Sequence, residues 1–448
     1  MTGGVKPFRG TGADARRYVE SDRSTADDYY LSERDALASW TLSDALGEVT
    51  AAADLGPRAY AAWVDWAHPV TGERMGVPRA AGDGRKGSPR FQEMIVNAPK
   101  SLSIAAALHP DVSAALDRAQ ADAADEIRRY LASHATTRVG PRGAQEVVPA
   151  EQLQTVGIVH RTSRAGDPHW HVHFQIGTRV WAAGAWRGLD GVALFKMQGA
   201  IRAVGTAVIA AHPHLAAVLD GHGLTLDPKT GEVVELEPFN AVMSKRGAQA
   251  ETNFARLVGE WERAHPGETM SRTMSGRLQA CAWAQDRPSK KPTTLAGEAA
   301  WIAELHHAGY DGTSLRRAAS APVAQLHALD ARWIANRALD RCAAEASAWT
   351  PHTIREQVAA LVTETGVRAA PGQLRQFTDQ AAGLARADCL SVLPLGAPAP
   401  EHVACLTSLD VIAAETRLRD LLTGLAANGE VPLADVGALA AARGLDQG

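Results

Sequence analysis

The chain has 448 residues, of which 46% are hydrophobic and 21% are charged, and its formal net charge at pH 7 is −4. This length exceeds what one core usually holds, so we expect two or three domains. No apolar run reaches the roughly 18 residues of a membrane span, and the N-terminus carries no apolar signal segment, so we expect a cytoplasmic protein without a membrane span. The slightly acidic charge gives no sign of a nucleic-acid partner, although a local basic patch can exist within a neutral whole.

Several elements can be predicted in chain order from hydrophobic periodicity. Residues 90–96 (RFQEMIV) are expected to form a strand that ends at the following Asn-Ala-Pro. Residues 110–132 show the pattern of an amphipathic helix with proline in its first turn. Residues 152–160 and 170–180 are rich in valine, isoleucine and aromatic residues and are predicted to be two further strands. Residues 191–211 are predicted to form one helix that ends before Pro213.

A change of composition divides the chain. Residues 287–294 (RPSKKPTT) contain two prolines and two adjacent lysines and are expected to form an exposed linker. Before it lie tight turns and strand-like runs, and after it the sequence is rich in alanine, leucine and arginine at helical spacing. We therefore expect an α+β fold, a sheet carrying helices, in residues 1–292, and a mainly helical region in residues 293–448.

Histidines are concentrated in the segment HRTSRAGDPHWHVH, which begins at His160. Alternate residues of a strand point to one face, so His169, His171 and His173 are expected to share a face, and the last two can converge on one ion. His160 ends the preceding strand, and a turn through residues 166–168 can bring it alongside. Three neutral imidazoles leave coordination positions open, which is typical of a catalytic metal site.

Two alternatives explain the histidines less well. A histidine-rich surface strand or an isolated structural site would account for a lone HxH pair, which many unrelated folds contain. Alternating histidines with a third at a neighbouring strand end are harder to explain in that way. A cupin-like site requires a glutamate shortly after the HxH pair, whereas Phe174, Gln175 and Ile176 follow here. The four cysteines lie far apart and form no CxxC pair, which argues against a zinc–thiolate site.

Three of the six tyrosines, Tyr18, Tyr29 and Tyr30, fall in one short N-terminal stretch. A phenol has a pKa of about 10, so it needs a base or a metal before it acts as a nucleophile near neutral pH. Paired tyrosines near acidic residues are also common on helix surfaces, so these residues alone leave a catalytic role open. Glu93, on the first predicted strand, can accept a phenolic proton or orient a metal-bound histidine, with a solvent-facing strand glutamate as the ordinary alternative.

Taken together, four segments resemble the MobF family of conjugative relaxases, within the HUH endonuclease superfamily, and they occur in the family's order. They are the tyrosine stretch with ADDYY and Trp40, the sequence APKSLS after the first predicted strand, the histidine segment, and LFKMQGAI, which looks like the opening of the helix after the site. The resemblance covers residues 18–292. It implies the HUH relaxase-like fold, a central antiparallel sheet with flanking helices.

The resemblance also implies roles for individual residues. One divalent metal ion, Mg²⁺ or Mn²⁺, is implied, with tyrosines and a carboxylate beside it. The roles fall on His160, His171 and His173 as metal ligands, Tyr18 as first nucleophile, Tyr29 as second tyrosine with Tyr30 beside it, and Glu93 where the family usually has an aspartate.

The implied reaction is site-specific cleavage and rejoining of single-stranded DNA at an origin of transfer. The deprotonated tyrosine attacks the scissile phosphate, giving a 5′-phosphotyrosyl link and a free 3′-hydroxyl, and the retained ester energy allows rejoining without ATP. Lys100 and Arg164 are candidate phosphate contacts, with a structural salt bridge as an equal alternative for each. Trp170, Trp181 and Trp186 are candidates for stacking on unpaired bases, although tryptophans are more often core residues.

The implied partners are origin DNA, which can carry a hairpin, and the accessory and coupling proteins of a relaxosome. No GxxxxGK[ST] loop occurs in the sequence, while residues 406–418 resemble the stretch ahead of a relaxase-linked helicase, so we expect an N-terminal portion of a longer protein. Three alternatives stay open: an HUH rolling-circle replication initiator, a metal-dependent hydrolase or oxygenase acting on small molecules, and a non-catalytic origin-binding module.

Overall fold

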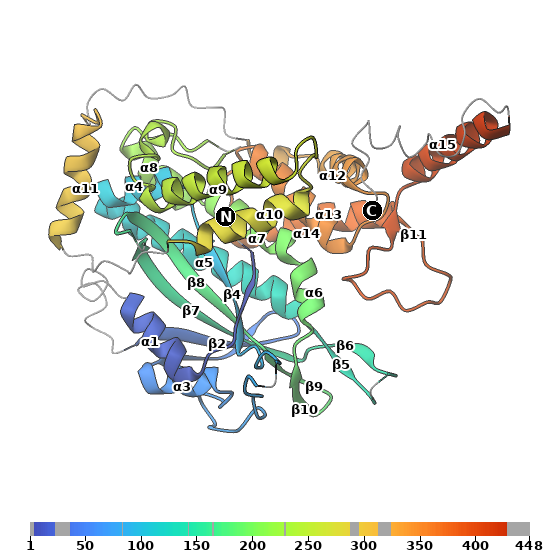
Figure 1. The fold of residues 1–448 in the computed structure, drawn as a ribbon, viewed down its shortest axis with the longest axis horizontal. Helices are drawn as coiled ribbons and strands as arrows, with labels where there is room; N and C mark the ends of the chain where they lie inside the picture. The colour runs from blue at the N-terminus through green and yellow to red at the C-terminus, as the bar shows by residue number, and fades with distance from the viewer. Residues whose placement is uncertain are drawn as a thin grey trace.

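In the computed structural model, the protein is built around one antiparallel sheet (Figure 1). The structure describes residues 4–22, 36–82, 84–141, 143–163, 165–227, 230–286, 295–311 and 324–427. The strand order is β1-β4-β8-β7-β2-β3, and β9 pairs with both β7 and β10. The strands of this sheet are β1 (Lys6–Phe8), β2 (Ala38–Asp44), β3 (Val49–Leu55), β4 (Phe91–Asn97), β7 (Gln152–Thr162), β8 (Pro168–Gly177), β9 (Arg179–Ala182) and β10 (Ala185–Gly188).

Helices flank this sheet and continue beyond residue 324, which confirms the predicted α+β fold class (Figure 1). Two short hairpins complete the described structure, β5 (Thr136–Val139) with β6 (Glu146–Pro149) and β11 (Leu390–Ser391) with β12 (Leu406–Thr407). The helices are α1 (Gly12–Asp22), α3 (Pro57–Val64), α4 (Lys100–Leu108), α5 (Pro110–His134), α6 (Gly191–Lys196), α7 (Gln198–Ala210), α8 (Pro213–Gly221), α9 (Lys245–Ala264), α10 (Arg272–Ala284), α11 (Leu295–His307), α12 (Ala331–Glu345), α13 (Pro351–Glu364), α14 (Pro371–Ala387) and α15 (Leu409–Ala427), with 3₁₀ turns η1 (Glu237–Phe239) and η2 (Leu326–Ala328).

The predicted strands at 90–96 and 152–160 and the predicted helix at 110–132 are confirmed as β4, β7 and α5. Helix α5 begins at its proline because proline has no N–H to lose in the first helical turn.

Two predicted boundaries are wrong. The strand expected over 170–180 ends at Gly177, where Thr178 turns the chain and donates to the carbonyl oxygens of Pro89 and Arg90. The helix expected over 191–211 is split into α6 and α7. Between them lies Met197, whose N–H donates to the carbonyl oxygens of both Ala193 and Leu194, so the last turn of α6 is tighter than a regular α-helix. Helix α7 then begins at Gln198.

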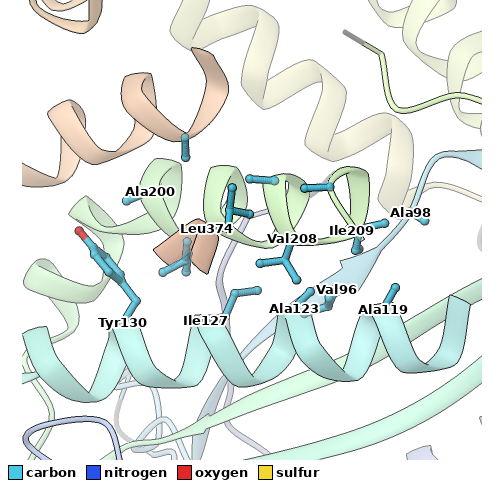
Figure 2. Packing of buried hydrophobic residues seen from close by; sticks show 14 of the residues in the cluster. Val96, Ala98, Ala119, Ala123, Ile127, Tyr130, Ala200, Val208, Ile209 and Leu374 are labelled. Carbon is cyan, nitrogen blue, oxygen red and sulfur yellow. The ribbon is translucent and has the colours of Figure 1, made fainter. Parts of the chain in front are cut away.

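One face of the sheet packs on α4 and α5, α7 packs on α5 in turn, and together they form the larger core. Every second residue of β8 points to this face, namely Val172, Phe174 and Ile176. Figure 2 shows the next layer, in which Ile127 of α5 faces Val208 of α7. The same cluster continues without a break into α12, α13 and α14. The described helical region therefore shares a core with the sheet, while the boundary expected at residue 292 lies outside the described residues and stays a prediction.

The opposite face carries a smaller core, made with α1 and α3 (Figure 1). Trp40 and Val156 from neighbouring strands pack there against Val19 of α1 and Tyr60 of α3. These side chains are at most 2% exposed, so they hold both helices firmly on the sheet. Burying apolar surface stabilises the folded state by roughly 25 cal/mol per Å², and this contribution holds α1 over this face.

Gly12 lets α1 approach α3 closely. A Cβ atom at Gly12 would lie 2.0 Å from the carbonyl oxygen of Ala61 and 2.7 Å from Oδ2 of Asp65. The Gly12 N–H also donates to Oδ1 of Asp65 over 3.0 Å. The first turn of α1 is therefore positioned by a contact that only glycine permits.

Among the described helices, none is by itself long and apolar enough to cross a membrane. The bent pair α7 and α8 meets that test jointly, by length and composition only. Apolar side chains of this pair, such as Ile201 and Leu215, are buried in the larger core.

We predict that Gly12→Ala lowers the free energy of unfolding by about 1–3 kcal/mol, because the added methyl group overpacks the α1–α3 contact. Gly383, exposed within α14 with nothing within 4 Å of its Cβ position, is the matched control. Gly383→Ala should stabilise the protein by about 0.5–1 kcal/mol through helix propensity. Urea denaturation measures both, and equal effects of the two substitutions would contradict the close-packing argument.

Candidate metal centre and catalytic cavity

The register of three neighbouring strands brings the site residues together. His160 of β7 lies directly opposite His171 of β8, and Ile158 lies opposite His173. On the other side of β8, Glu93 of β4 lies opposite Gln175. Directly paired residues of an antiparallel sheet point to the same face, so these side chains gather on the face that carries α1 and α3.

His160, His171 and His173 form a group whose nitrogen atoms fit one metal ion. One ring nitrogen from each lies within 4.8 Å of the others, and all three residues are buried. Among the described residues, no other group of histidine, cysteine, aspartate and glutamate meets this geometry. Nε2 of His171 and Nε2 of His173 are 3.3 Å apart. Two nitrogens bound about 2.1 Å from one ion at a tetrahedral angle lie roughly 3.4 Å apart, so the spacing fits.

The other ring nitrogens are held so that Nε2 faces inward. Nδ1 of His171 lies 2.7 Å from the carbonyl oxygen of His169, which can only accept, so Nδ1 carries the proton. Nδ1 of His173 lies 3.2 Å from the Glu93 carboxylate. A carbonyl oxygen or a carboxylate beside the outer ring nitrogen fixes the tautomer and orientation of metal-binding histidines.

Glu93 is itself held by a buried chain of hydrogen bonds. The hydroxyl of Tyr60 donates to Oε1 of Gln175 over 2.9 Å, and Nε2 of Gln175 donates to Glu93 over 3.1 Å. Burial strongly raises the pKa of Tyr60, so it stays a donor. Burial also favours the neutral form of Glu93, but its contacts with His173 and Gln175 outweigh this and hold the pKa of the carboxyl below its usual value. The glutamate is therefore ionised at neutral pH.

His171 and its neighbour His169 are held in the neutral form, which is the form of imidazole that binds metals. Burial, together with the neighbouring imidazoles, holds the pKa of His171 well below its usual value. Burial and the nearby Lys100 lower the pKa of His169 to about 3. Both rings are neutral at physiological pH, and only a neutral imidazole has a free lone pair for an ion.

Tyr18 lies on α1 beside the histidines. Its ring is half-buried and meets the ring of His173 edge-on, with 6.2 Å between the centroids and 83° between the planes. Helix α1 is held there by the smaller core, which includes its neighbour Val19. The predicted residues Tyr29 and Tyr30 lie outside the described residues.

A cavity of about 880 Å³ opens over the histidines. Its floor is the sheet face, and Tyr18 forms part of one wall. Strand β1 lines it through Lys6, and the hairpin of α9 and α10 lines it through Arg246 and Trp283. The volume lies in the range of roughly 300–1,000 Å³ that ligand pockets occupy.

The turn between β7 and β8 is clamped by the helices above it. Asp167 is 1% exposed and accepts a hydrogen bond from the backbone N–H of Lys245, the first residue of α9, over 2.9 Å. The Lys245 Nζ lies 3.3 Å from the same carboxylate. The Trp301 indole of α11 donates to the carbonyl of Gly166 over 2.8 Å. These contacts tie the helical wall of the cavity to the turn that precedes the histidines.

Lys100, at the start of α4, also lines the cavity. Its Nζ donates to the carbonyl oxygen of Pro168 over 2.7 Å, so it makes a structural contact as well as facing the cavity. Burial is the main cause that lowers its pKa to about 8, against the opposing charge of Asp167. The other candidate phosphate contact, Arg164, lies outside the described residues.

Sequence reasoning did not single out every residue of this site. Gln175 follows His173 by two positions on β8, so strand alternation predicts that it shares the face of the histidines. Tyr60, Asp167 and Trp283 gave no local signal, because their roles depend on contacts between segments far apart in the chain.

Comparison with known proteins adds a family and a fold. The family described as TrwC relaxase matches residues 12–308, more than half of the chain. A copper-bound structure of conjugative relaxase TrwC with oriT DNA is 22% identical, with a TM-score of 0.51 over 69% of this chain and 100% of that one, which shows a shared fold. A metal-free TrwC complex with oriT DNA is 21% identical, with a TM-score of 0.49 over 68% of this chain and 99% of that one. A TrwC complex with a 27-mer DNA is 20% identical, with a TM-score of 0.48 over 69% of this chain and 100% of that one. Among curated proteins, none matches the chain.

We predict that His171→Ala abolishes measurable Mn²⁺ binding in isothermal titration calorimetry, because one of three ligands is lost. Glu93→Gln should weaken Mn²⁺ binding by about 10–100-fold, because the side chain beside Nδ1 of His173 no longer carries a negative charge. His222→Ala is the control, since His222 contacts Asp111 away from this cavity, and it should leave the affinity unchanged. Unchanged affinity in His171→Ala would contradict the ligand set.

Proposed function

The chain belongs to the TrwC relaxase family, and from this premise we propose that it cleaves and rejoins single-stranded DNA at an origin of transfer through Tyr18. The family match confirms the resemblance to MobF relaxases and makes the protein a DNA-nicking strand transferase. The alternative of a hydrolase or oxygenase acting on small molecules is thereby set aside.

One observation carries the choice of nucleophile. Tyr18 is a half-buried phenol whose ring meets His173 edge-on, on the wall of the cavity whose floor holds the histidine group. A phosphate placed over the histidines would therefore lie within the same enclosed space as this side chain. Positioning of this kind accounts for much of the catalysis in phosphoryl transfer.

The proposed step balances without an external energy source. The Tyr18 phenol loses its proton to solvent, and its oxygen forms a bond to the scissile phosphorus. The bond from phosphorus to the 3′ oxygen breaks, and that oxygen takes up a proton to become a free hydroxyl. The 5′-phosphotyrosyl ester retains the energy of the original diester, so the reverse attack by a 3′-hydroxyl rejoins the strand.

The remaining residues of the site orient the reacting groups. A divalent ion held by the three histidines would offset the charge that develops on the phosphate oxygens. We propose Mg²⁺ or Mn²⁺ for this position. Glu93 accepts a hydrogen bond from Gln175 and lies 3.2 Å from Nδ1 of His173, which supports an orienting role for the carboxylate. Lys100 faces the cavity as a cation at neutral pH, which supports a phosphate contact.

In this proposal the substrate is the single-stranded origin DNA, with or without a hairpin, and the protein acts in the cytoplasm with relaxosome accessory and coupling proteins. The solved TrwC structures contain oriT DNA, and one contains a 27-mer with the recognition hairpin and the cleavage site. Tyr29 is proposed as the second tyrosine, with Tyr30 beside it.

We predict that the full chain, incubated with Mn²⁺ and a randomised pool of single-stranded 40-mers, forms a covalent DNA adduct that survives denaturing electrophoresis. Mass spectrometry of the digested adduct should identify the modified tyrosine as Tyr18. Tyr18→Phe should reduce the adduct by at least about 100-fold, because no other described tyrosine lines the cavity over the metal-site histidines.

Two controls make the assignment specific. Tyr310→Phe alters a tyrosine that packs against Phe239 and lies outside the cavity lining, so adduct formation should stay at the wild-type level. A chelator should abolish the adduct, and Mg²⁺ or Mn²⁺ should restore it. An undiminished adduct in Tyr18→Phe would move the nucleophile to Tyr29 or Tyr30.

A further inference from the structure

Trp283 is a half-exposed aromatic side chain on the wall of the catalytic cavity. It lies on α10, and 47% of its surface is exposed. It lines the same cavity as Tyr18 and the three histidines. The tryptophans that hold the two cores, such as Trp40 and Trp349, are buried instead. A large flat ring left open to a cavity can bind the apolar face of a ligand.

Side chains of α9 hold the end of α10 on which this ring stands. Arg246 donates to the carbonyl oxygen of Trp283. Asn253 donates to the carbonyl of Ala282 over 3.3 Å, and Gln249 donates to the carbonyl of Asp286 over 2.9 Å. The carbonyls of Ala282 and Trp283, in the last turn of α10, have no partner within the helix, so these bonds satisfy them, while the bond to Asp286 holds the residues that follow. The backbone under Trp283 is therefore fixed before a ligand arrives, so binding costs little conformational entropy at this position.

A cation accompanies the ring. The guanidinium carbon of Arg246 lies 5.6 Å from the centroid of the Trp283 ring, within the range of a cation–π contact. Arg246 lines the cavity as well. An aromatic face beside a positive charge is the combination that binds single-stranded nucleic acid, since the ring takes a base and the cation attracts the phosphates.

Resting on the proposed function, we propose that Trp283, supported by Arg246, is the stacking site for one unpaired base of the DNA strand in the catalytic cavity. Every base has an aromatic face, so this contact adds affinity with little choice of sequence. It keeps the strand against this wall of the cavity while a phosphate lies over the histidines on the floor.

The three tryptophans that the sequence offers as candidates for stacking on bases, with a core role as the more common alternative, lie elsewhere. Trp170 is 4% exposed, and its indole donates to Ser113, so it is a core residue. Trp181 and Trp186 contact each other edge-on and do not line this cavity. Trp333, on α12, is 54% exposed and also lies outside the cavity lining, so it is a matched control for Trp283.

The test compares two probes that share their phosphates and differ in their bases. Fluorescence anisotropy measures binding of the full chain, in chelator, to fluorescein-labelled 30-mer oligothymidylate and to an abasic oligomer of the same length. Trp283→Ala should weaken oligothymidylate binding by about 5- to 150-fold and leave abasic binding unchanged. Trp283→Phe should keep most of the affinity, and Trp333→Ala should bind both probes like the wild type.

Three outcomes would overturn the inference. Trp283→Ala could bind oligothymidylate as the wild type does, it could lose both probes equally, or Trp283→Phe could be as weak as Trp283→Ala while both keep the wild-type circular dichroism spectrum. The covalent adduct on Tyr18 separates this inference from the proposed function. If the adduct forms in all variants while Trp283 makes no difference to binding, only the stacking site fails. If the wild type neither binds DNA nor forms the adduct, the relaxase mechanism fails as well.

Discussion

The pairing of β7 with β8 is the constraint on which the rest of the site depends. It places His160 opposite His171 across the sheet. Side chains alternate along a strand, so a slip of one residue would turn His171 and His173 into the opposite, apolar core. The turn that joins the strands fixes this register, since Ser163 and Asp167 are bonded to each other through backbone and side chains.

The two faces of the sheet are specialised for different tasks. On one face, alternate residues of β8 enter a large apolar core shared with α5, α7 and the helices beyond residue 324. On the other face, the next residues of the same strand are histidines and a glutamine in a polar, half-enclosed space. Burying several imidazoles and the Glu93 carboxylate costs free energy, because charged and polar groups lose their hydration. The larger core on the first face and the smaller core beside the histidines offset this cost, which allows this part of the sheet to be organised for chemistry.

The sequence predicts what depends on local periodicity. Alternation along β8 predicts a shared face for His171 and His173, and proline marks the start of α5. Placement of Tyr18 is different, because it depends on the contact of Gly12 with α3, which no local pattern encodes. The clamp on Asp167 likewise joins a turn to a helix that begins 78 residues later. Long-range contacts of this kind decide which residues meet, and they require the folded structure.

The net charge of −4 also says little about the cavity, because the charges there are local. Lys6, Lys100 and Arg246 line the cavity with two carboxylates. Each carboxylate is already engaged, Glu93 with His173 and Asp167 with the start of α9. Three cations against two carboxylates leave a small excess of positive charge in the lining, and an ion on the histidines would add to it. A DNA strand is attracted by this local field, which a chain-wide sum of charges does not reveal.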